Sequence, residues 1–507
     1  MSSMNRTQKF AINSITAAMT QIVAMIVGFI TPRVMITTYG SEINGLVSSL
    51  NQFISYIALV EAGIGGAAIY SLYKPLAQKD ELAISRVVKA AKKSYFQAGY
   101  IFSTGIFFLA LLYGILCSTE TLNFWTIFPL AILLGANRCL NFFMLSGHTV
   151  LLTADQKNFV VSLITIIQSV LRTIIVCCLA YFKTNVVLLY ALALIPLALR
   201  AVLLLTYCKK NYPYIRSDVE PDKTSLKKRW DVIYQQMLGT VQVGAPTVIA
   251  TIILNFTMVS VFSIYNMVIT GINGVLGIFT SGLPAGFGEL IAKNERDTLR
   301  KSVSEFEVAY YYILTVVYGV TMAMILPFVS VYTKDFHDVN YYYPALAFVI
   351  VLNGLLYNIK TPQSMLIISA GMYKETRWRV TAQGLILIVF GVLLGIPFGL
   401  VGIIAGSCLS NLYRTIDLLH FTPKYITGSK YHIAPLRMLR VIITITLIAI
   451  PSFLININVD GYFEWVLYAV AFGIYALIIT TIITFIFDKK DFFALYKRMR
   501  SMIFRRK

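Results

Sequence analysis

The sequence predicts an all-α polytopic membrane protein with about 14 transmembrane helices. The 507 residues are 57% hydrophobic and 13% charged, with a mean hydropathy of +0.73. Apolar runs long enough to cross a bilayer recur from end to end. The longest hydrophilic stretch, 209–234, is too short for a separate soluble domain. Peptide groups in lipid must bond within their own segment, so we expect every span to be a helix.

The first two spans form a hairpin joined by the short connection 39–42. The first span ends with Pro32 and Arg33, and the second carries Glu61 just before a glycine-rich turn. Charge inside hydrocarbon costs several kcal/mol, so these residues point to function. The expected helices cover residues 10–37, 44–72, 94–117, 124–153, 157–182, 186–207, 235–254, 259–287, 303–331, 343–370, 377–396, 400–420, 438–456 and 464–487.

The distribution of basic residues predicts the orientation of the helices. Most of the 43 Lys and Arg residues lie in the termini and in the connections on one side of the membrane, whereas the other side holds Lys183 and Lys334. By the positive-inside rule both termini are cytoplasmic. The net charge of +20 therefore indicates a membrane surface and no nucleic-acid partner. The basic, aromatic tail 488–507 is expected to lie on the anionic inner leaflet.

Two internal similarities suggest a repeat. Residues 41–74 match 260–293, and 151–158 match 366–374, at nearly the same offset of about six helices. An offset of six helices keeps the orientation, so the repeats would be parallel; chance similarity between apolar segments is the alternative. The expected organisation is an N-terminal lobe (1–208), a cytoplasmic linker (209–234), a C-terminal lobe (235–421), two further helices (422–487) and the tail (488–507).

Basic residues outnumber acidic residues inside the expected helices. The basic ones nearest mid-depth are Arg138, Arg172 and Lys360. Such residues usually face a bundle interior or a water-filled cavity. An excess of guanidinium and ammonium groups suits an anionic ligand such as a phosphate. Two further candidates, Arg33 and Arg200, lie near helix ends, where their side chains can also reach the membrane surface.

Polar side chains at helical spacing accompany these charges. Each would face away from lipid and line a cavity, or would join helices by hydrogen bonds. The sequence leaves Glu61 with two roles, pairing with a cation or binding a proton or sodium ion. The candidate lining residues are Asn141, Asn353, Tyr357, Asn266 and Asn273.

Several classes of site have no motif in the sequence. There is no Walker P-loop, no nucleophile motif and no clustered metal ligands, and the six cysteines show no CxxC spacing. We therefore expect no cofactor, no metal site and no enzymatic activity. A membrane polysaccharide polymerase would need a large outer loop or a catalytic carboxylate pair, which the sequence lacks.

Three stretches resemble a known family. Residues 28–67 and 73–80 are similar to the first hairpin of bacterial polysaccharide repeat-unit flippases of the Wzx type, and 151–160 and 360–377 also resemble them. The likeness covers nearly the whole chain. It places the protein beside lipid II flippases and multidrug-and-toxin extruders, in the multidrug/oligosaccharidyl-lipid/polysaccharide exporter superfamily. The hairpin motif carries over only Arg33 and Glu61; the other cations follow from the charge argument.

The resemblance implies two six-helix lobes around a central cavity. It implies an undecaprenyl-pyrophosphate-linked oligosaccharide as cargo, flipped from the inner to the outer leaflet of the bacterial cytoplasmic membrane by alternating access, for capsule or O-antigen. A proton or sodium gradient would drive transport, and polysaccharide polymerase machinery would be a further partner. The alternative is a drug or metabolite exporter of the same superfamily, which would need acidic cavity residues.

Overall fold

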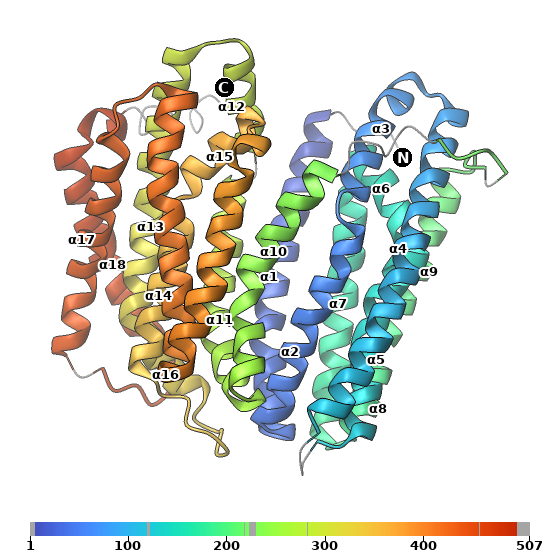
Figure 1. Cartoon of the computed structure of the whole chain (residues 1–507), viewed down its shortest axis with the longest axis horizontal. Coiled ribbons are helices and arrows are strands. Elements are labelled where there is room, and N and C mark those ends of the chain that lie inside the picture. Colours follow the sequence, from blue (N-terminus) through green and yellow to red (C-terminus); the bar gives the residue numbers. More distant parts are fainter. Residues whose placement is uncertain are drawn as a thin grey trace. The chain divides into compact units, whose positions relative to one another are not determined.

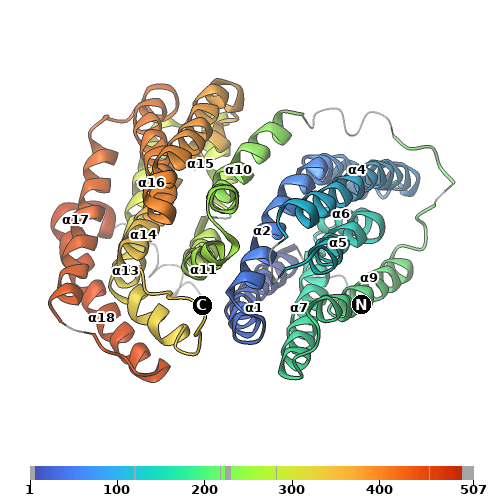
Figure 2. The same cartoon turned by 60° about the horizontal axis from the view of Figure 1, so that its bottom comes forward.

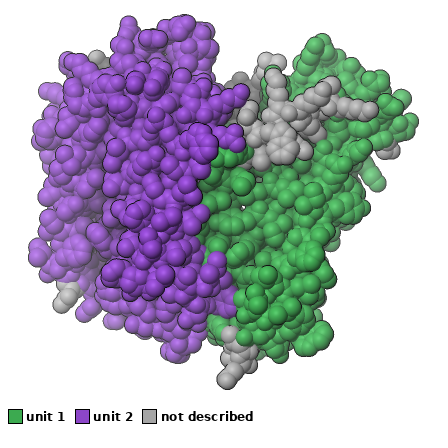
Figure 3. Space-filling view, in the orientation of Figure 1, with its two compact units in different colours: residues 1–248 green, residues 249–507 purple. Residues whose placement is uncertain are grey.

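The computed structural model describes residues 6–118, 122–216, 218–222, 230–280, 282–455 and 457–493. Every regular element in these residues is helical (Figure 1). The chain divides into two compact units, Met1–Val248 and Ile249–Lys507 (Figure 3). The all-helical fold class is confirmed. The expected domain boundaries stay predictions, and most of the basic tail, from residue 494 on, lies outside the described residues.

Unit 1 contains long helices with breaks at defined positions. The bounds are α1 Arg6–Tyr39, α2 Ser41–Ile57, η1 Ala58–Glu61, α3 Ile64–Gln78, α4 Glu81–Leu116, α5 Phe124–Leu140, η2 Asn141–Leu145, α6 Ser146–Ala154, α7 Asn158–Tyr181, α8 Val186–Leu192, α9 Ile195–Asn211 and α10 Trp230–Ile253, which runs into unit 2. The expected second helix is broken at Gly63, which has a φ of 77°. The expected fourth helix contains a π-helical turn, η2.

Unit 2 repeats this arrangement and adds two helices. The bounds are α11 Phe256–Thr280, α12 Leu283–Ala292, α13 Arg296–Tyr332, α14 Pro344–Ile359, α15 Thr361–Ala370, α16 Tyr373–Thr422, η3 Pro423–Thr427, α17 Ile433–Leu454 and α18 Tyr462–Phe487. Within the units α2, α3, α4, α5 and α6 make the same pairwise contacts as α11, α12, α13, α14 and α15. Figure 2 shows α4, α5 and α6 grouped together, and α13, α14 and α16 likewise. The internal repeat inferred from sequence is therefore present in the fold.

The described residues contain 13 helical segments long and apolar enough to cross a membrane. One of them, Tyr373–Thr427, is 55 residues long and contains the non-helical residue Gly399, with a φ of 58°. The Ser410 hydroxyl on one side of Gly399 donates to the Gln383 carbonyl on the other, at 2.7 Å. The segment is therefore a tight hairpin. Its two arms correspond to the expected helices 377–396 and 400–420, which brings the segments to the predicted 14.

Glycines let the two arms of α16 approach closely. A Cβ atom on Gly406 would lie 2.4 Å from the backbone nitrogen of Gly391, and one on Gly402 would lie 1.8 Å from the Leu394 carbonyl oxygen. Gly391 and Gly395 on one arm face Gly402 and Gly406 on the other, so each arm carries the small-xxx-small spacing of closely packed membrane helices.

A polar cluster at one end of unit 1 ties three helices together. Asp155 accepts a hydrogen bond from the Tyr212 hydroxyl at 2.6 Å and pairs with Lys157 at 2.8 Å and with Lys9 at 3.8 Å. Burial, together with the hydrogen bond to Asp155, raises the pKa of Tyr212 far above its usual value. The Tyr212 hydroxyl therefore keeps its proton and stays a donor. The cluster joins the start of α1 to the α6–α7 turn and the end of α9.

The close packing of α16 predicts the effect of adding one methyl group. Gly406→Ala forces the two arms apart, so we expect it to lower the free energy of unfolding by about 1–3 kcal/mol. Gly384→Ala on the same helix is the matched control, because nothing lies within 4 Å of its added Cβ. Thermal unfolding of the purified proteins in detergent measures both. Equal melting temperatures for the two variants would contradict the close packing.

Candidate functional site

A cavity of about 350 Å³ lies within unit 1, among the broken helices. It is large enough to hold several water molecules. Four of the residues predicted from sequence line it: Glu61, Arg138, Asn141 and Arg200. Its other lining residues come from α3, α4, η2 and α6, and the polar ones among them are Tyr95, Ser146, Thr149 and Thr153.

Glu61 and Arg138 face each other in this cavity. The Glu61 Oε1 atom lies 3.5 Å from Arg138 Nη1, and both side chains are partly exposed, 34% for Glu61 and 46% for Arg138. Glu61 ends the 3₁₀ turn η1 and precedes the left-handed Gly63, so the break in the second helix presents the carboxylate to the cavity. Glu61 therefore lies within ion-pair distance of a cation, and its role in binding a proton or sodium ion stays a prediction.

Arg138 lies at the end of α5, just before the π-helical turn. The turn begins at Asn141, whose side-chain amide (Nδ2) donates to the backbone carbonyl of Asn137 at 2.8 Å. The turn inserts one extra residue, and such insertions are frequent at functional sites because they redirect side chains. Here the cation and Asn141 both line the cavity at the point where the helix departs from α geometry.

The second cation of the cavity, Arg200, has a neutral partner. Its guanidinium donates to the Gln168 Oε1 atom on α7 at 3.0 Å, and among the described residues it forms no ion pair. The cavity therefore contains two guanidinium groups and one carboxylate. Arg172 on α7 and Arg33 on α1 are half-buried and do not line it. Of the four cations predicted in unit 1, the cavity thus brings together two, Arg138 and Arg200.

The remaining predicted cation, Lys360, lies in unit 2 at the break between α14 and α15. It is 6% exposed, and its ammonium group donates to Asn411 Oδ1 at 2.6 Å and to the Tyr357 carbonyl at 3.2 Å. The Asn411 amide in turn donates to Asn353 Oδ1 at 2.9 Å. Throughout the described chain no carboxylate lies within ion-pair distance of Lys360. Neutral oxygens therefore hold this buried cation.

The other predicted lining residues have different surroundings. The Tyr357 ring lies 4.5 Å from the Lys360 ammonium nitrogen, in a cation–π contact. Asn273 accepts a hydrogen bond from the Asn358 amide at 2.7 Å, which supports the reading of this residue as a link between helices. Asn266 is half-buried on α11, one turn before Thr270, which donates to its carbonyl.

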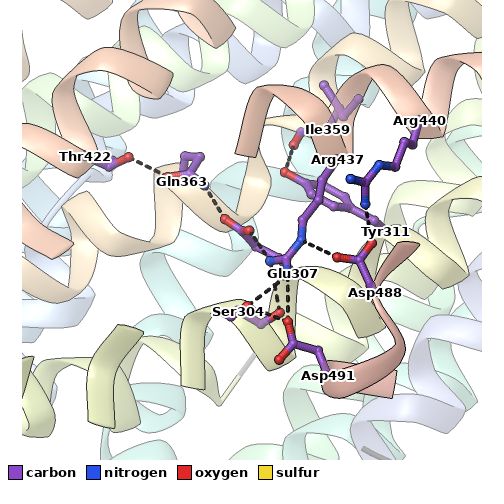
Figure 4. A network of polar contacts seen from close by, with 10 residues as sticks. All are labelled: Ser304, Glu307, Tyr311, Ile359, Gln363, Thr422, Arg437, Arg440, Asp488 and Asp491. Carbon is purple, nitrogen blue, oxygen red and sulfur yellow. Dashed lines mark hydrogen bonds and ion pairs between the residues drawn. The ribbon is translucent and has the colours of Figure 1, made fainter. Parts of the chain in front are cut away.

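Figure 4 shows a buried ionic network in unit 2 that the sequence analysis missed. Arg437 on α17 pairs with Glu307 on α13 at 2.9 Å, with Asp488 at 3.1 Å and with Asp491 at 2.6 Å. Arg440 pairs with Asp488 as well, at 2.8 Å. Glu307 also accepts from the Gln363 amide on α15. One arginine therefore connects α17 and the residues after α18 to α13, and through Gln363 to the helix that follows Lys360.

A better helix boundary could have revealed part of this network. The sequence analysis began the thirteenth expected helix at 438, one residue after Arg437, whereas α17 begins at Ile433. Glu307 lies inside the expected helix 303–331 but was not among the predicted site residues, and it is only 4% exposed. The pairing itself joins residues 130 positions apart, and helical spacing carries no information about such contacts.

Within the described residues no group of three His, Cys, Asp or Glu side chains is arranged to hold a metal ion.

The network predicts unequal roles for its two arginines. Arg437→Met leaves three carboxylates without their shared cation, so we expect a loss of about 3–5 kcal/mol in the free energy of unfolding. Arg440→Met is the matched control. Its side chain is 30% exposed and pairs with Asp488, which keeps Arg437, so the expected loss is below about 1 kcal/mol. Thermal unfolding in detergent tests the difference, and equal losses would contradict the central position of Arg437.

No protein-family model and no curated protein sequence matches the chain. Several solved structures do match the chain. An inward-facing MATE-family multidrug resistance transporter of the MOP superfamily is 14% identical, with a TM-score of 0.65 over 85% of this chain and 99% of the other. The lipid II flippase MurJ, in an inward closed conformation, is 13% identical, with a TM-score of 0.61 over 93% and 99%.

A third structure differs in its pocket. It is a MOP superfamily transporter from Pyrococcus furiosus, described as having a binding pocket of reverse polarity that suggests a different function. It is 14% identical, with a TM-score of 0.53 over 86% of this chain and 96% of the other. These likenesses establish the fold. Together with the candidate membrane-spanning helices of the described residues, they show that the chain is a multi-pass membrane protein with the fold of MOP superfamily transporters.

Proposed function

We propose that this protein is a flippase for oligosaccharides linked to undecaprenyl pyrophosphate. It moves the repeat unit from the inner to the outer leaflet of the bacterial cytoplasmic membrane by alternating access, and so supplies surface polysaccharide such as capsule or O-antigen. The observation that carries the proposal is the cavity of unit 1, with Arg138 and Arg200 against the single carboxylate of Glu61.

The sign of the cavity charge favours an anionic cargo. A guanidinium group binds a phosphate through two parallel hydrogen bonds, and both arginines are placed where a ligand in the cavity would meet them. Lys360 supports the same reading in unit 2, since its buried charge has only neutral partners among the described residues. A cavity built for a cationic drug would need the opposite balance.

The fold supports a lipid-linked cargo. One structural neighbour is named as a flippase of lipid II, so this helical architecture accommodates a lipid-linked substrate in that protein. For this chain, the proposal places the pyrophosphate at Arg138 and Arg200, with Lys360, Arg172 and Arg33 as further contacts along the path. The lipid chain would stay in the membrane, and the process needs no cofactor.

The remaining parts of the proposal come from the charge distribution and from the family resemblance. The bias of basic residues puts both termini in the cytoplasm, with the tail against anionic lipids. A proton or sodium gradient supplies the energy, with Glu61 as the candidate coupling carboxylate. Polysaccharide polymerase machinery, which consumes the flipped units, is the expected protein partner.

A second candidate function is ion-coupled export of a drug or metabolite. It is favoured by the multidrug resistance transporter, whose TM-score of 0.65 exceeds the 0.61 of the flippase. The polarity of the pocket distinguishes a flippase of anionic lipids from an exporter of cationic drugs. The P. furiosus transporter, described as having a pocket of reverse polarity, shows that polarity varies on this fold. The cavity of unit 1 carries a net positive charge, so an exporter on this chain would take an anionic metabolite.

Complementation tests the proposal. Deletion of the gene in its host should abolish surface polysaccharide and leave lipid-linked intermediate on the inner leaflet. Wild type should restore the polysaccharide and remove the accumulated intermediate. Arg138→Ala, Arg200→Ala and Lys360→Ala each remove a charged hydrogen-bond donor, so we expect at least about a tenfold loss of transport at equal membrane levels. Surface polymer and intermediate are quantified together.

Lys293→Ala is the control, because this lysine pairs with Glu289 in solvent, at 2.5 Å, and does not line the cavity. It should complement as wild type does. If deletion leaves the polysaccharide unchanged, the flippase assignment is wrong. Accumulation of an anionic metabolite inside the deletion strain would then support the exporter in its place.

A further inference from the structure

The charges of the cavity in unit 1 do not balance. Its ionisable lining residues are Glu61 from η1, Tyr95 from α4, Arg138 from α5 and Arg200 from α9. Tyrosine is neutral at physiological pH, which leaves two positive charges and one negative charge. Arg200 has the neutral Gln168 as its partner, so the single carboxylate stands against Arg138.

The Glu61–Arg138 pair is loose and accessible. Its nitrogen–oxygen distance of 3.5 Å is well beyond the roughly 2.7–2.9 Å of a strong charge-assisted bond. By contrast, the buried Arg437–Glu307 pair of unit 2 is 2.9 Å long, with side chains 8% and 5% exposed. Glu61 and Arg138 therefore form a contact that an incoming anion can replace, whereas Arg437 and Glu307 form a closed structural pair.

We propose that Glu61 is an internal counter-anion: it neutralises Arg138 when no cargo is bound, and the phosphate of the cargo displaces it. The inference rests on the proposed function, since it assumes an anionic cargo at Arg138. It replaces the coupling role considered above for Glu61, because a proton that binds together with the cargo leaves with it and cannot draw the cargo outward along an inward proton gradient.

Competition between Glu61 and the cargo determines whether protonation strengthens or weakens cargo binding. Ionised Glu61 and the cargo phosphate compete for one guanidinium, so anything that removes the charge of Glu61 strengthens anion binding. A proton on Glu61 does this, and by reciprocity bound cargo favours protonation of Glu61. A proton and an anionic cargo thus bind together at this site, whereas a proton and a cationic drug on one carboxylate would exclude each other.

The counter-anion serves two steps of transport. An uncompensated arginine within the membrane is costly, so the pair with Glu61 stabilises the cavity after release of the cargo. The same carboxylate weakens the hold of Arg138 on the phosphate and so speeds release. Both effects need Glu61 to stay next to Arg138, as the break at η1 and Gly63 allows.

Anion affinity measures the competition directly. The full-length protein in lipid nanodiscs is titrated with farnesyl pyrophosphate, a short prenyl pyrophosphate, and the Kd is determined at pH 7.5. We expect Glu61→Gln to bind about two- to fivefold more tightly than wild type, the range of a partly exposed ion pair. Glu289→Gln is the matched control, because Glu289 pairs with Lys293 away from the cavity, and its Kd should equal that of wild type.

A double-mutant cycle separates competition from a general effect on structure. In an Arg138→Gln background the competitor has nothing to compete for, so Glu61→Gln should leave the Kd unchanged. The affinity of wild type should also rise between pH 8 and pH 6 more than that of Glu61→Gln. This comparison cancels the titration of the probe itself. Glu61→Ser is the second neutral variant, used if the first fails to fold.

The outcomes distinguish failure of the counter-anion inference from failure of the proposed function on which it rests. If Arg138→Gln and Arg200→Gln leave binding of farnesyl pyrophosphate unchanged, the cationic-cavity proposal fails. If binding depends on both arginines but neither neutral variant at Glu61 binds more tightly than wild type, only the counter-anion is refuted. An increase that persists in the Arg138→Gln background also refutes it, because Glu61 would then act elsewhere.

Discussion

Inside a bilayer every peptide group must find its hydrogen-bond partner within the protein, and this constraint organises the whole chain. It makes each crossing a helix, and it makes any break in a helix exceptional. Three of the breaks, at Gly63, at the π-helical turn and at Lys360, have a charged residue at or near them. At these three departures from regular α geometry the fold places Glu61, Arg138 and Lys360.

The two units solve the same electrostatic problem differently. At the break after α5, the cation is exposed to a cavity and faces a carboxylate from a neighbouring break. At the corresponding break after α14, Lys360 is buried among amide and carbonyl oxygens. Neutral oxygens leave the charge of the lysine intact, whereas a carboxylate cancels that of the arginine. The internal repeat therefore keeps a break at corresponding positions of the two units, with different electrostatic surroundings at each.

Much of the fold could be predicted from sequence because the length and hydropathy of a segment are enough to identify a membrane helix. The two arms of α16 were expected as separate helices, and the turn at Gly399 confirms them. The repeat was also visible, although weak. The site was harder. Charge at mid-depth selected Arg138, which lines the cavity of unit 1, and Lys360, which is buried in unit 2, but the same argument selected Arg172, which does not line the cavity. Depth along a helix says nothing about which way a side chain faces.

Long-range pairing explains what else sequence reasoning missed. Arg437 binds carboxylates from α13 and from the end of α18, and no local pattern links these segments. Through Glu307 and Gln363 the network reaches the first turn of α15, directly after Lys360. The two helices beyond the six-helix pattern are thus fastened to the element that carries the buried lysine. A closed pair such as Arg437–Glu307 fixes that element, whereas the open pair of Glu61 and Arg138 leaves its cation available. The two pairs have the same residue types and differ in burial and distance. The open pair is the one for which we propose a role in cargo binding.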